Sequence, residues 1–376
     1  MVLSKSKQKS IIVISAINLR MGGGLTILRD CLNYISSSHI SKDYRVIALV
    51  HAKDIANYPN IEYIEFPKSS SSWLRRLYYE YVYFKRLSNV LKPHLWLSLH
   101  DISPIVYADR QAVYMHNPSI VNKIKLDDLK YDKKYIAFSL FYKYLYRINI
   151  HSNSYCIVQQ NWFREICSDL YSVPKDKFIV ANPNLQIQNY TLTKTEQINK
   201  YCVKFFYPSV PRPFKNFETL CEAALILEKK KISNITITIT LDGTENAYAK
   251  DIFHKYKNCS LINFIGLLNK EDMYKQYEET DCLIFTSRLE TWGLPISEFL
   301  PTKKPMILAD EPYAHETSQG AKEVFFYKTN DAAMLAKIMT NLIKGDHSKF
   351  KQQKFIPVNK PYANNYEELF KILLTN

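Results

Sequence analysis

The sequence has few glycines and no long apolar run, and both shortages limit what the chain can be. No stretch of 18 or more apolar residues occurs, so the sequence predicts no transmembrane helix. The first apolar run, Ile11–Ala16, is followed by Asn18 and Arg20 without a small-residue cleavage site. We therefore interpret it as a buried strand after a polar tail, and not as a signal peptide.

The cysteines and acidic residues lack the spacings of a metal site. Seven cysteines form no Cys-x-x-Cys pair and leave one over, which is typical of buried free thiols in a reducing, cytoplasmic compartment. No Asp-x-Asp motif occurs, and Asp127-Asp128 stands among lysines with no strand before it. The sequence therefore predicts no metal and no other cofactor. Zinc-finger spacing and RNP-like aromatic motifs are also absent, so we expect no nucleic-acid partner.

What the chain does contain is an alternation of strand-like and helix-length patterns, which predicts an α/β protein with parallel sheets. A chain of 376 residues, 47% of them hydrophobic, is long enough for two domains. A polar stretch rich in Thr and Gln divides the pattern near its middle. We predict an N-terminal domain over residues 1–185, a linker over 186–200, a C-terminal domain over 201–360 and a last helix over 361–376.

Each predicted domain has its own set of strands and helices. The expected strands are Ile11–Ala16, Arg45–Val50, Ile61–Phe66, His94–Leu99, Val113–His116, Tyr155–Gln159, Phe178–Ala181, Lys204–Tyr207, Ile235–Leu241, Leu261–Phe264, Cys282–Thr286 and Pro305–Leu308. The expected helices are Leu25–Ser36, Trp73–Leu91, Lys134–Ile148, Asn161–Leu170, Asn216–Lys230, Glu245–Tyr256, Lys270–Glu278, Pro295–Leu300, Ala332–Leu342 and Tyr362–Leu374.

Three consecutive glycines, Gly22–Gly24, stand out in a chain with only eight. They follow the first strand and open the first helix. Backbone amides without side chains at a helix N-terminus let a phosphate or sugar approach closely, so Gly23 and Gly24 are candidate residues for binding such a ligand. The full Gly-x-Gly-x-x-Gly pattern is absent, and a merely flexible turn is the alternative interpretation.

The most informative segment runs from Phe285 to Glu298, where two glutamates stand eight positions apart after a strand. Glu290 lies in the loop, and Glu298 lies inside a short helix. Gly293 and Pro295 shape the start of that helix, where free amides can hold diphosphate oxygens. Glu298 is placed one turn further on, where it can accept hydrogen bonds from vicinal hydroxyls.

This segment resembles the glutamate–seven residues–glutamate motif of the retaining glycosyltransferases of the family 4 group. The resemblance implies a GT-B fold, with two Rossmann-like domains whose parallel sheets face each other across a cleft. It implies that Glu290 orients the donor sugar and that Glu298 holds the ribose of a nucleotide sugar. The amides around Thr291, Trp292, Gly293 and Leu294 would stabilise the diphosphate.

Further segments of the second half are similar to this family. Arg212 and Lys215, in Phe206–Glu218, resemble the basic pair that grips the donor diphosphate, although their spacing of three residues is shorter than in many relatives. Gly243 stands in a turn after a strand, and Gly266 in the loop that would receive the base. The resemblance implies that these cations and helix amides replace a metal ion.

In the first half the resemblance is thinner. His116, in Tyr114–Pro118, looks like the cleft histidine that contacts the transferred sugar. Asp101, at the end of another strand, and Asn117 are candidate acceptor-binding residues. The resemblance also implies that the last helix packs back on the N-terminal domain.

Positive charge is concentrated in the first half. Residues 1–183 hold 25 Lys and Arg against 14 Asp and Glu, whereas residues 184–376 hold 25 against 22. Such asymmetry favours an anionic partner. Two segments, Trp73–Leu87 and Lys123–Arg147, mix basic and aromatic residues as membrane-surface helices do. In the first, Leu74, Leu77, Tyr81 and Phe84 recur at helical spacing and are expected to face the core, with Arg75, Arg76, Tyr79, Tyr83 and Arg86 on the other side.

The resemblance thus implies a hexosyltransferase that uses a UDP- or GDP-linked sugar. Its acceptor would be a lipid-linked saccharide in bacterial surface polysaccharide assembly (O-antigen or capsule), at the inner face of the cytoplasmic membrane. Two alternatives remain at this point: a nucleotide-sugar 2-epimerase of the same fold, and a non-catalytic scaffold on a membrane. The base, sugar, linkage and oligomeric state are not indicated by the sequence.

Overall fold

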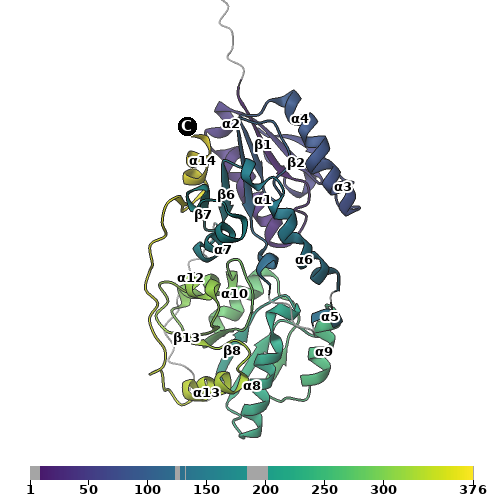
Figure 1. Cartoon of the computed structure of the whole chain (residues 1–376). Helices are drawn as coiled ribbons and strands as arrows, with labels where there is room; N and C mark the ends of the chain where they lie inside the picture. The colour runs from purple at the N-terminus through teal and green to yellow at the C-terminus, as the bar shows by residue number, and fades with distance from the viewer. Residues whose placement is uncertain (1–8, 123–127, 132, 184–201, 376) are drawn as a thin grey trace, which may run out of the picture. The chain divides into compact units, whose positions relative to one another are not determined.

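The computed structural model describes residues 9–122, 128–131, 133–183 and 202–375, and the chain forms two compact units (Figure 1). Unit 1 comprises Met1–Ile120, Ser139–Asn184 and Val358–Asn376, and unit 2 comprises Val121–Phe138 and Leu185–Pro357. The predicted linker, residues 186–200, lies outside the described residues.

Unit 1 is built on an eight-stranded sheet in which all paired strands are parallel, in the order β14-β7-β6-β5-β4-β1-β2-β3. Its strands are β1 (Ile11–Ala16), β2 (Arg45–Val50), β3 (Glu62–Glu65), β4 (Leu95–Ser98), β5 (Arg110–Met115), β6 (Tyr155–Val158), β7 (Phe178–Ala181) and β14 (Tyr362–Ala363). Its helices are α1 (Gly22–Ser37), α2 (Ile40–Asp43), α3 (Trp73–Tyr78), the π-helix η2 (Tyr79–Tyr83), α4 (Phe84–Leu91), α7 (Asn161–Tyr171) and α14 (Tyr366–Leu374). Short 3-10 turns are η1 (Lys53–Ile55), η3 (Pro118–Val121), η4 (Ile150–Ser152) and η5 (Lys175–Lys177), and α6 (Lys133–Arg147) begins in the part of the chain assigned to unit 2.

The central strand β1 is buried along its whole length because both faces of the sheet are covered. Ile12 and Ile14 belong to a core with α1 and α14, whereas Ile11 and Val13 belong to a second core with α4. A strand that is buried on both faces reads as a continuous apolar run, which is why the sequence predicts it correctly.

Unit 2 contains a six-stranded sheet, again with parallel pairing, in the order β10-β9-β8-β11-β12-β13. Its strands are β8 (Val203–Tyr207), β9 (Ile235–Ile239), β10 (Ile262–Phe264), β11 (Cys282–Phe285), β12 (Met306–Ala309) and β13 (Val324–Tyr327). Its helices are α5 (Asp128–Tyr131), α8 (Phe217–Lys229), α9 (Ala247–Tyr256), α10 (Lys270–Glu279), α11 (Leu294–Phe299), α12 (Pro312–Thr317) and α13 (Ala332–Ile343), with 3-10 turns η6 (Pro213–Lys215) and η7 (Leu300–Thr302). Helices α8 and α13 pack against each other.

The predicted α/β class with two parallel sheets is confirmed. The sequence pattern did not indicate β13 or β14, nor the short helices α2, α5 and α12. All seven cysteines are free thiols, as predicted, and six of them are buried. Within the described residues no helix is long and apolar enough to cross a membrane.

The prediction of which side chains in the helical region Trp73–Leu91 face the core was wrong for three of them. Leu74, expected in the core, is 80% exposed, whereas Tyr79 and Tyr83, expected outside, pack edge-on against Phe66. Phe84 is buried, as predicted. The reason is the π-helix η2: its wider turn changes the phase of the helix, so a pattern read with a constant 3.6-residue period is rotated on either side of it.

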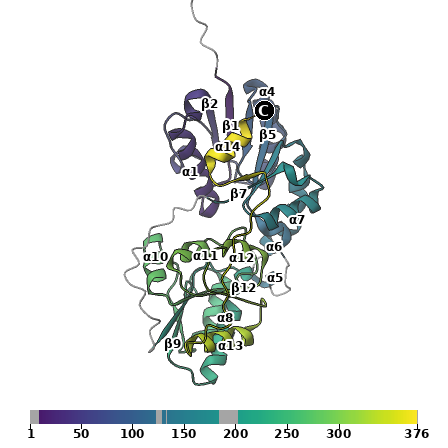
Figure 2. The same ribbon diagram turned by 90° about the vertical axis from the view of Figure 1, so that its left-hand side faces the viewer.

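The last helix, α14, belongs to unit 1 although it ends the chain. Figure 2 shows it, in yellow, beside α1, which lies near the other end of the chain. The ring of Tyr34 on α1 stacks on Tyr366 and Phe370, and the Tyr366 hydroxyl donates to the carbonyl of Ile27 at 3.2 Å.

Residues 121–138 group with unit 2, whereas the sequence pattern placed them in the N-terminal domain. The contacts of α5 account for this grouping. Lys130 and Tyr131 both bind the carboxylate of Asp251 on α9, and the ring of Tyr131 packs edge-on against Tyr248 at 5.3 Å. Sequence periodicity carries no signal for such long-range polar contacts.

Candidate functional site

The strand order of unit 2 marks the place where a ligand is expected. The chain runs outward from β8 to β9 and β10, and then returns to β11 on the other side of β8. The loops after β8 and β11 therefore diverge, and parallel α/β sheets bind ligands beyond the carboxyl ends of the strands at such a point. Lys215 follows β8, and Glu290 follows β11.

An ion pair joins these two loops. The ammonium Nζ of Lys215 contacts Oε1 of Glu290, and the two side chains are 15% and 16% exposed. The same ammonium lies 5.4 Å from the centre of the Phe214 ring. The structure thus brings together a cation and an acid that the sequence analysis assigned to diphosphate and donor sugar.

Backbone hydrogen bonds fix Lys215 in place. Its carbonyl accepts from the hydroxyl of Tyr207 at 2.5 Å and from that of Thr286 at 3.0 Å. The next residue, Asn216, has a φ of +58° and occupies the N-cap position of α8. Its side-chain amide donates to the carbonyl of Thr286 at 3.3 Å. The loop after β8 is therefore bound directly to the end of β11.

Arg212 occupies a different position from Lys215. Its side chain is exposed, and its carbonyl accepts the backbone N–H of Lys215 at 2.9 Å, at the start of η6. The three-residue spacing thus places the two cations at the two ends of one short 3-10 turn.

The start of α11 depends on Gly293. This residue has a φ of +85°, and a Cβ there would lie 3.3 Å from the Tyr313 ring and from Ile296. The carbonyl of Trp292 accepts from the hydroxyl of Thr317, and the indole N–H donates to Ser297 at 3.0 Å. Thr291 is partly exposed in the loop before it, and Leu294 is exposed at the first helical position.

Glu298 lies on the same short helix and is held by a tyrosine. The Tyr277 hydroxyl, on α10, donates to Oε2 of Glu298 at 2.9 Å. Burial raises the pKa of Glu298, and the Tyr277 hydrogen bond and the charge of Lys270 lower it in part. A half-buried carboxyl group that a tyrosine hydroxyl holds in place is suited to accept hydrogen bonds from the hydroxyl groups of a ligand.

Gly243 and Gly266 stand in adjacent turns after β9 and β10. They have φ values of +92° and +71°, and a Cβ on Gly266 would lie 2.9 Å from Oδ2 of Asp242. Glu245 accepts the backbone N–H groups of Asp242 and Gly243 at 3.0 and 3.1 Å. Hydrogen bonds from Thr244 lower the pKa of Asp242. Both glycines therefore serve a tight turn, at the same edge of the sheet as Lys215.

In unit 1 the structure brings the glycine-rich turn and His116 together. A Cβ on Gly24 would lie 3.7 Å from Nε2 of His116 and 2.9 Å from the side chain of Leu19. Gly22 and Gly23 have open space around them, and no side chain caps the N-terminus of α1. His116 therefore lies beside a helix end with accessible amides.

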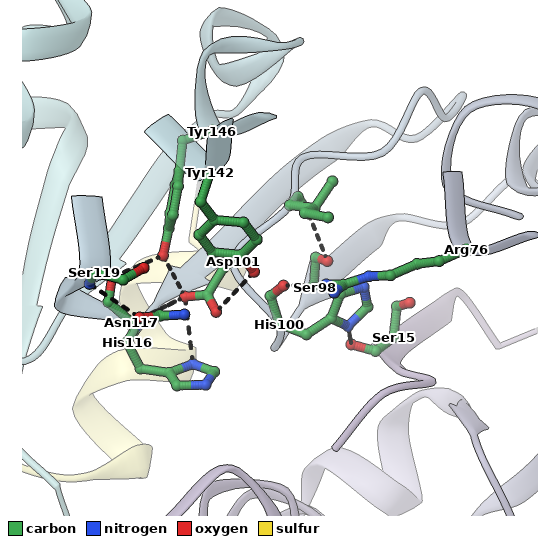
Figure 3. A network of polar contacts seen from close by, with 11 residues as sticks. Ser15, Arg76, Ser98, His100, Asp101, His116, Asn117, Ser119, Tyr142 and Tyr146 are labelled. Carbon is green, nitrogen blue, oxygen red and sulfur yellow. Dashed lines mark hydrogen bonds and ion pairs between the residues drawn. The ribbon is translucent and has the colours of Figure 1, made fainter. Parts of the chain in front are cut away.

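Asp101 is 5% exposed and holds the loop that carries His116 (Figure 3). Its Oδ1 accepts the backbone N–H groups of His116 and Asn117 at 2.7 and 3.1 Å and the hydroxyl of Tyr146 at 2.6 Å. The Tyr142 hydroxyl donates to Oδ2 at 3.4 Å, and Nδ1 of His116 lies 3.6 Å from Oδ1. The residue adopts a φ of +70°, which is strained for a non-glycine residue. This geometry supports a positioning role for Asp101 better than direct contact with an acceptor.

The peptide before Asp101 is fixed by a buried pair that sequence reasoning missed. Nε2 of His100 contacts Oε1 of Glu80 at 2.5 Å, and its Nδ1 contacts the carbonyl of Ser15 at 3.1 Å. Arg76 donates to the carbonyl of His100 at 3.1 Å. Glu80 lies in the π-helix η2, inside an aromatic segment whose pattern gave no sign of a buried acid.

Among the described residues, no group of three or more His, Cys, Asp and Glu side chains could hold a metal ion. Asp127 lies outside the described residues, and Asp128 is paired with Arg288. Sequence reasoning also missed Tyr277 and Arg288. Tyr277 comes from a separate helix, so its proximity to Glu298 has no sequence signal.

Residues 193–357 match the family "Glycosyl transferases group 1". No curated protein is significantly similar to this sequence.

Solved structures show the fold. The lipopolysaccharide outer core galactosyltransferase WaaB has a TM-score of 0.61 and 13% identity, over 90% of this chain and 91% of that one. WaaG, a glycosyltransferase involved in lipopolysaccharide biosynthesis, has a TM-score of 0.61 and 12% identity, over 89% and 90%. HepE of Anabaena, solved in complex with UDP-glucose, has a TM-score of 0.59 and 13% identity, over 90% and 92%. The chain therefore has the GT-B fold, and its second unit identifies it as a glycosyltransferase.

Proposed function

We propose that this glycosyltransferase is a retaining, metal-independent hexosyltransferase that moves a sugar from a UDP- or GDP-linked donor to a lipid-linked saccharide. Surface polysaccharide assembly, as O-antigen or capsule, is the process it would serve. The observation that supports the donor site best is the Lys215–Glu290 pair at the point where the β8 and β11 loops diverge. HepE, whose structure contains UDP-glucose, supports a nucleotide sugar as the donor.

The chemistry of the site follows from where charge develops. When the bond to the sugar breaks, negative charge accumulates on the departing diphosphate. Lys215, Arg212 and the amides at the start of α11 can stabilise that charge without a metal ion. Glu290, held against Lys215, would orient the donor sugar, and Glu298 would bind the ribose hydroxyls.

We propose that His116 contacts the transferred sugar. Its Nε2 lies beside Gly24, while Asp101 holds the backbone of the same loop. Gly23 and Gly24 would let ligand oxygens approach the amides of α1. Retention without a positioned nucleophile is consistent with attack on the same face, with the leaving phosphate accepting the acceptor's proton.

A lipid-linked acceptor is supported by an exposed apolar stripe on α6. Leu140, Phe141, Tyr144 and Ile148 recur at helical spacing and are all exposed, and Arg147 lies beside them. Tyr142, an aromatic residue of the segment Lys123–Arg147 that was predicted to bind a membrane surface, is buried and packs edge-on against Trp73 of α3. Lys123 and Lys125 lie outside the described residues.

Helix α3 extends this surface. Trp73, Leu74 and Tyr78 are exposed on it, and the Arg76 guanidinium lies 5.0 Å from the Trp73 ring. Exposed aromatic and aliphatic side chains beside cations are suited to the interface of an anionic membrane. We propose that unit 1 binds the inner face of the cytoplasmic membrane through this surface.

The experiment that tests the proposed function measures turnover of UDP- and GDP-sugars with the purified chain. Transfer to a lipid-linked saccharide with retained configuration, unchanged by EDTA, is the expected result. Isomerisation of the donor without an acceptor would instead identify a 2-epimerase. Binding of neither nucleotide by calorimetry would leave a scaffold and overturn the proposal.

A further inference from the structure

Arg288, two residues before Glu290, ties the β8 loop to the β11 loop independently of the Lys215–Glu290 pair. Its backbone N–H donates to the carbonyl of Phe214 at 2.8 Å. Its Nη2 donates to the carbonyl of Pro213 at 2.9 Å. Pro213 and Phe214 are the two residues before Lys215. Together with the hydrogen bonds of Tyr207 and Thr286 to the Lys215 carbonyl, these bonds hold Lys215 beside the loop of Glu290.

The counter-ion of Arg288 comes from a distant part of the sequence. Oδ1 of Asp128, on α5, accepts from the same Nη2 at 3.1 Å, and each side chain is 11% exposed. The position of a nearly buried guanidinium depends on its acidic partner, because removing one member of a buried ion pair leaves an uncompensated charge. Asp128 is thus needed to keep Arg288 in this position.

A second route leads from α5 to the same loop. The ring of Tyr131 packs edge-on against Tyr248, whose hydroxyl accepts the backbone N–H of Phe217 at 3.1 Å. Phe217 begins α8, two residues after Lys215. Helix α5 therefore supports Lys215 from both sides of the residue, through Arg288 and through Tyr248.

We infer that Arg288 is a positioning residue for Lys215 and Glu290, and that α5, through Asp128, is part of the support of the donor site. The inference rests on the proposed function and deepens it. It gives a role to a segment that follows the His116 loop in the sequence but belongs to unit 2. Neither residue needs to touch the donor.

The test compares Asp128→Ala, Arg288→Ala and their double variant with Lys130→Ala in the full chain. Lys130 is the matched control because it lies on α5 and pairs with Asp251, but is exposed and does not reach Arg288. UDP and GDP are titrated by calorimetry, and donor KM and kcat are measured separately. All comparisons are made below the melting temperature of the least stable variant.

We expect each of the two single variants to weaken binding of the nucleoside diphosphate about tenfold and to lower kcat by up to about a hundredfold. The double variant should be no worse than the more affected single variant, because the pair acts as one unit. Lys130→Ala should bind like the wild type. Where Asp128→Ala does not fold, Asp128→Asn replaces it, and we expect it to lose less nucleoside diphosphate affinity and less kcat than the alanine variant would.

Two other results are distinguishable. If the wild type binds UDP or GDP and the Asp128 and Arg288 variants bind equally well, or match Lys130→Ala, the positioning role is overturned and the proposed function stands. Additive losses in the double variant would also overturn it. If the wild type binds neither nucleotide and turns over no nucleotide sugar, the proposed function itself fails, and the inference with it.

Discussion

Lys215 and Glu290 neutralise each other across the loops that follow β8 and β11, in a position where little water reaches either group. They are 75 residues apart in the sequence, and the reversal of strand order between β8 and β11 brings them together. An ammonium held in this way can stabilise the charge of a leaving diphosphate, because its position is already fixed.

Replacing Glu290 by Gln, or Lys215 by Ala, is expected to lower kcat by about 10² to 10³, which is typical of losing one preorganised electrostatic group. The fold should persist, since both side chains retain some exposure. Kinetics with the identified donor, with circular dichroism as a check of folding, measures the effect. Glu279→Gln, in the exposed pair with Lys204, is the control. Full turnover in Glu290→Gln would contradict the site.

Replacing Asp101 by Ala should destabilise the protein by about 3 kcal/mol, because it leaves the buried donors of His116, Asn117 and Tyr146 without their acceptor. Asn keeps an oxygen and tolerates the left-handed backbone, so Asp101→Asn should lose less. Urea unfolding gives the difference in free energy. Asp109→Ala, in an exposed pair with His94, should change little. Equal losses in Asp101→Ala and Asp109→Ala would contradict this account of the loop.

Replacing Gly24 by Ala is expected to raise donor KM, because the added methyl group would lie 2.9 Å from Leu19 and 3.7 Å from Nε2 of His116. The neighbouring substitution, Gly23→Ala, meets open space and removes backbone freedom from the unfolded chain. We expect it to raise the free energy of unfolding by about 0.5 to 1 kcal/mol. Steady-state kinetics and urea unfolding of both variants separate the two effects. A larger loss of stability for Gly23→Ala than for Gly24→Ala would refute the packing argument.

Glu298 should make stability depend on pH. Burial raises its pKa above the ordinary value of 4.5. The folded protein therefore holds the proton of Glu298 more tightly than the unfolded chain does. The contribution of this proton to the free energy of unfolding is complete below pH 4.5 and is lost as the pH rises through the folded pKa.

The variant Glu298→Gln tests this. It stays neutral, so we expect it to be more stable than the wild type above that window and equal to it below, while binding UDP or GDP more weakly. Urea unfolding between acidic and neutral pH measures the difference. Tyr277→Phe removes a hydrogen bond that lowers the pKa and should move the window to higher pH. A difference that does not change with pH would show that Glu298 keeps its ordinary pKa.

The apolar stripe of α6 should carry membrane binding. We expect the double substitution Leu140→Ser and Phe141→Ser to reduce binding to vesicles that contain phosphatidylglycerol by about tenfold or more, since two apolar side chains no longer enter the interface. Co-sedimentation with vesicles measures it. Val90→Ser, which removes an isolated side chain of α4 that is 79% exposed, is the matched control. An equal loss in both variants would point to non-specific adsorption.

Much of the fold is determined locally. The fully buried strands β1 and β7 have the bounds that their apolar runs predict, because a strand covered on both faces leaves a continuous signal in the sequence. Glu290 and Glu298 were predicted from their positions after a strand, and Lys215 was predicted from its resemblance to the basic pair of the glycosyltransferases. The core-facing side chains of Trp73–Leu91 were not predicted correctly, because a π-helical turn has no signature in a 3.6-residue pattern.

What only the tertiary structure decided is which side chains meet. Asp128 and Arg288 are 160 residues apart, and Glu80 and His100 belong to different elements. Glu80 and Asp128 lie in helices, and the packing of each helix, which local sequence preference does not set, brings it to its partner. The sequence by itself determined most of the strands, the longer helices and the edge of the sheet at which we propose the donor site. The folded chain decided which charges neutralise each other there, because Coulomb and hydrogen-bond partners are chosen by distance in space.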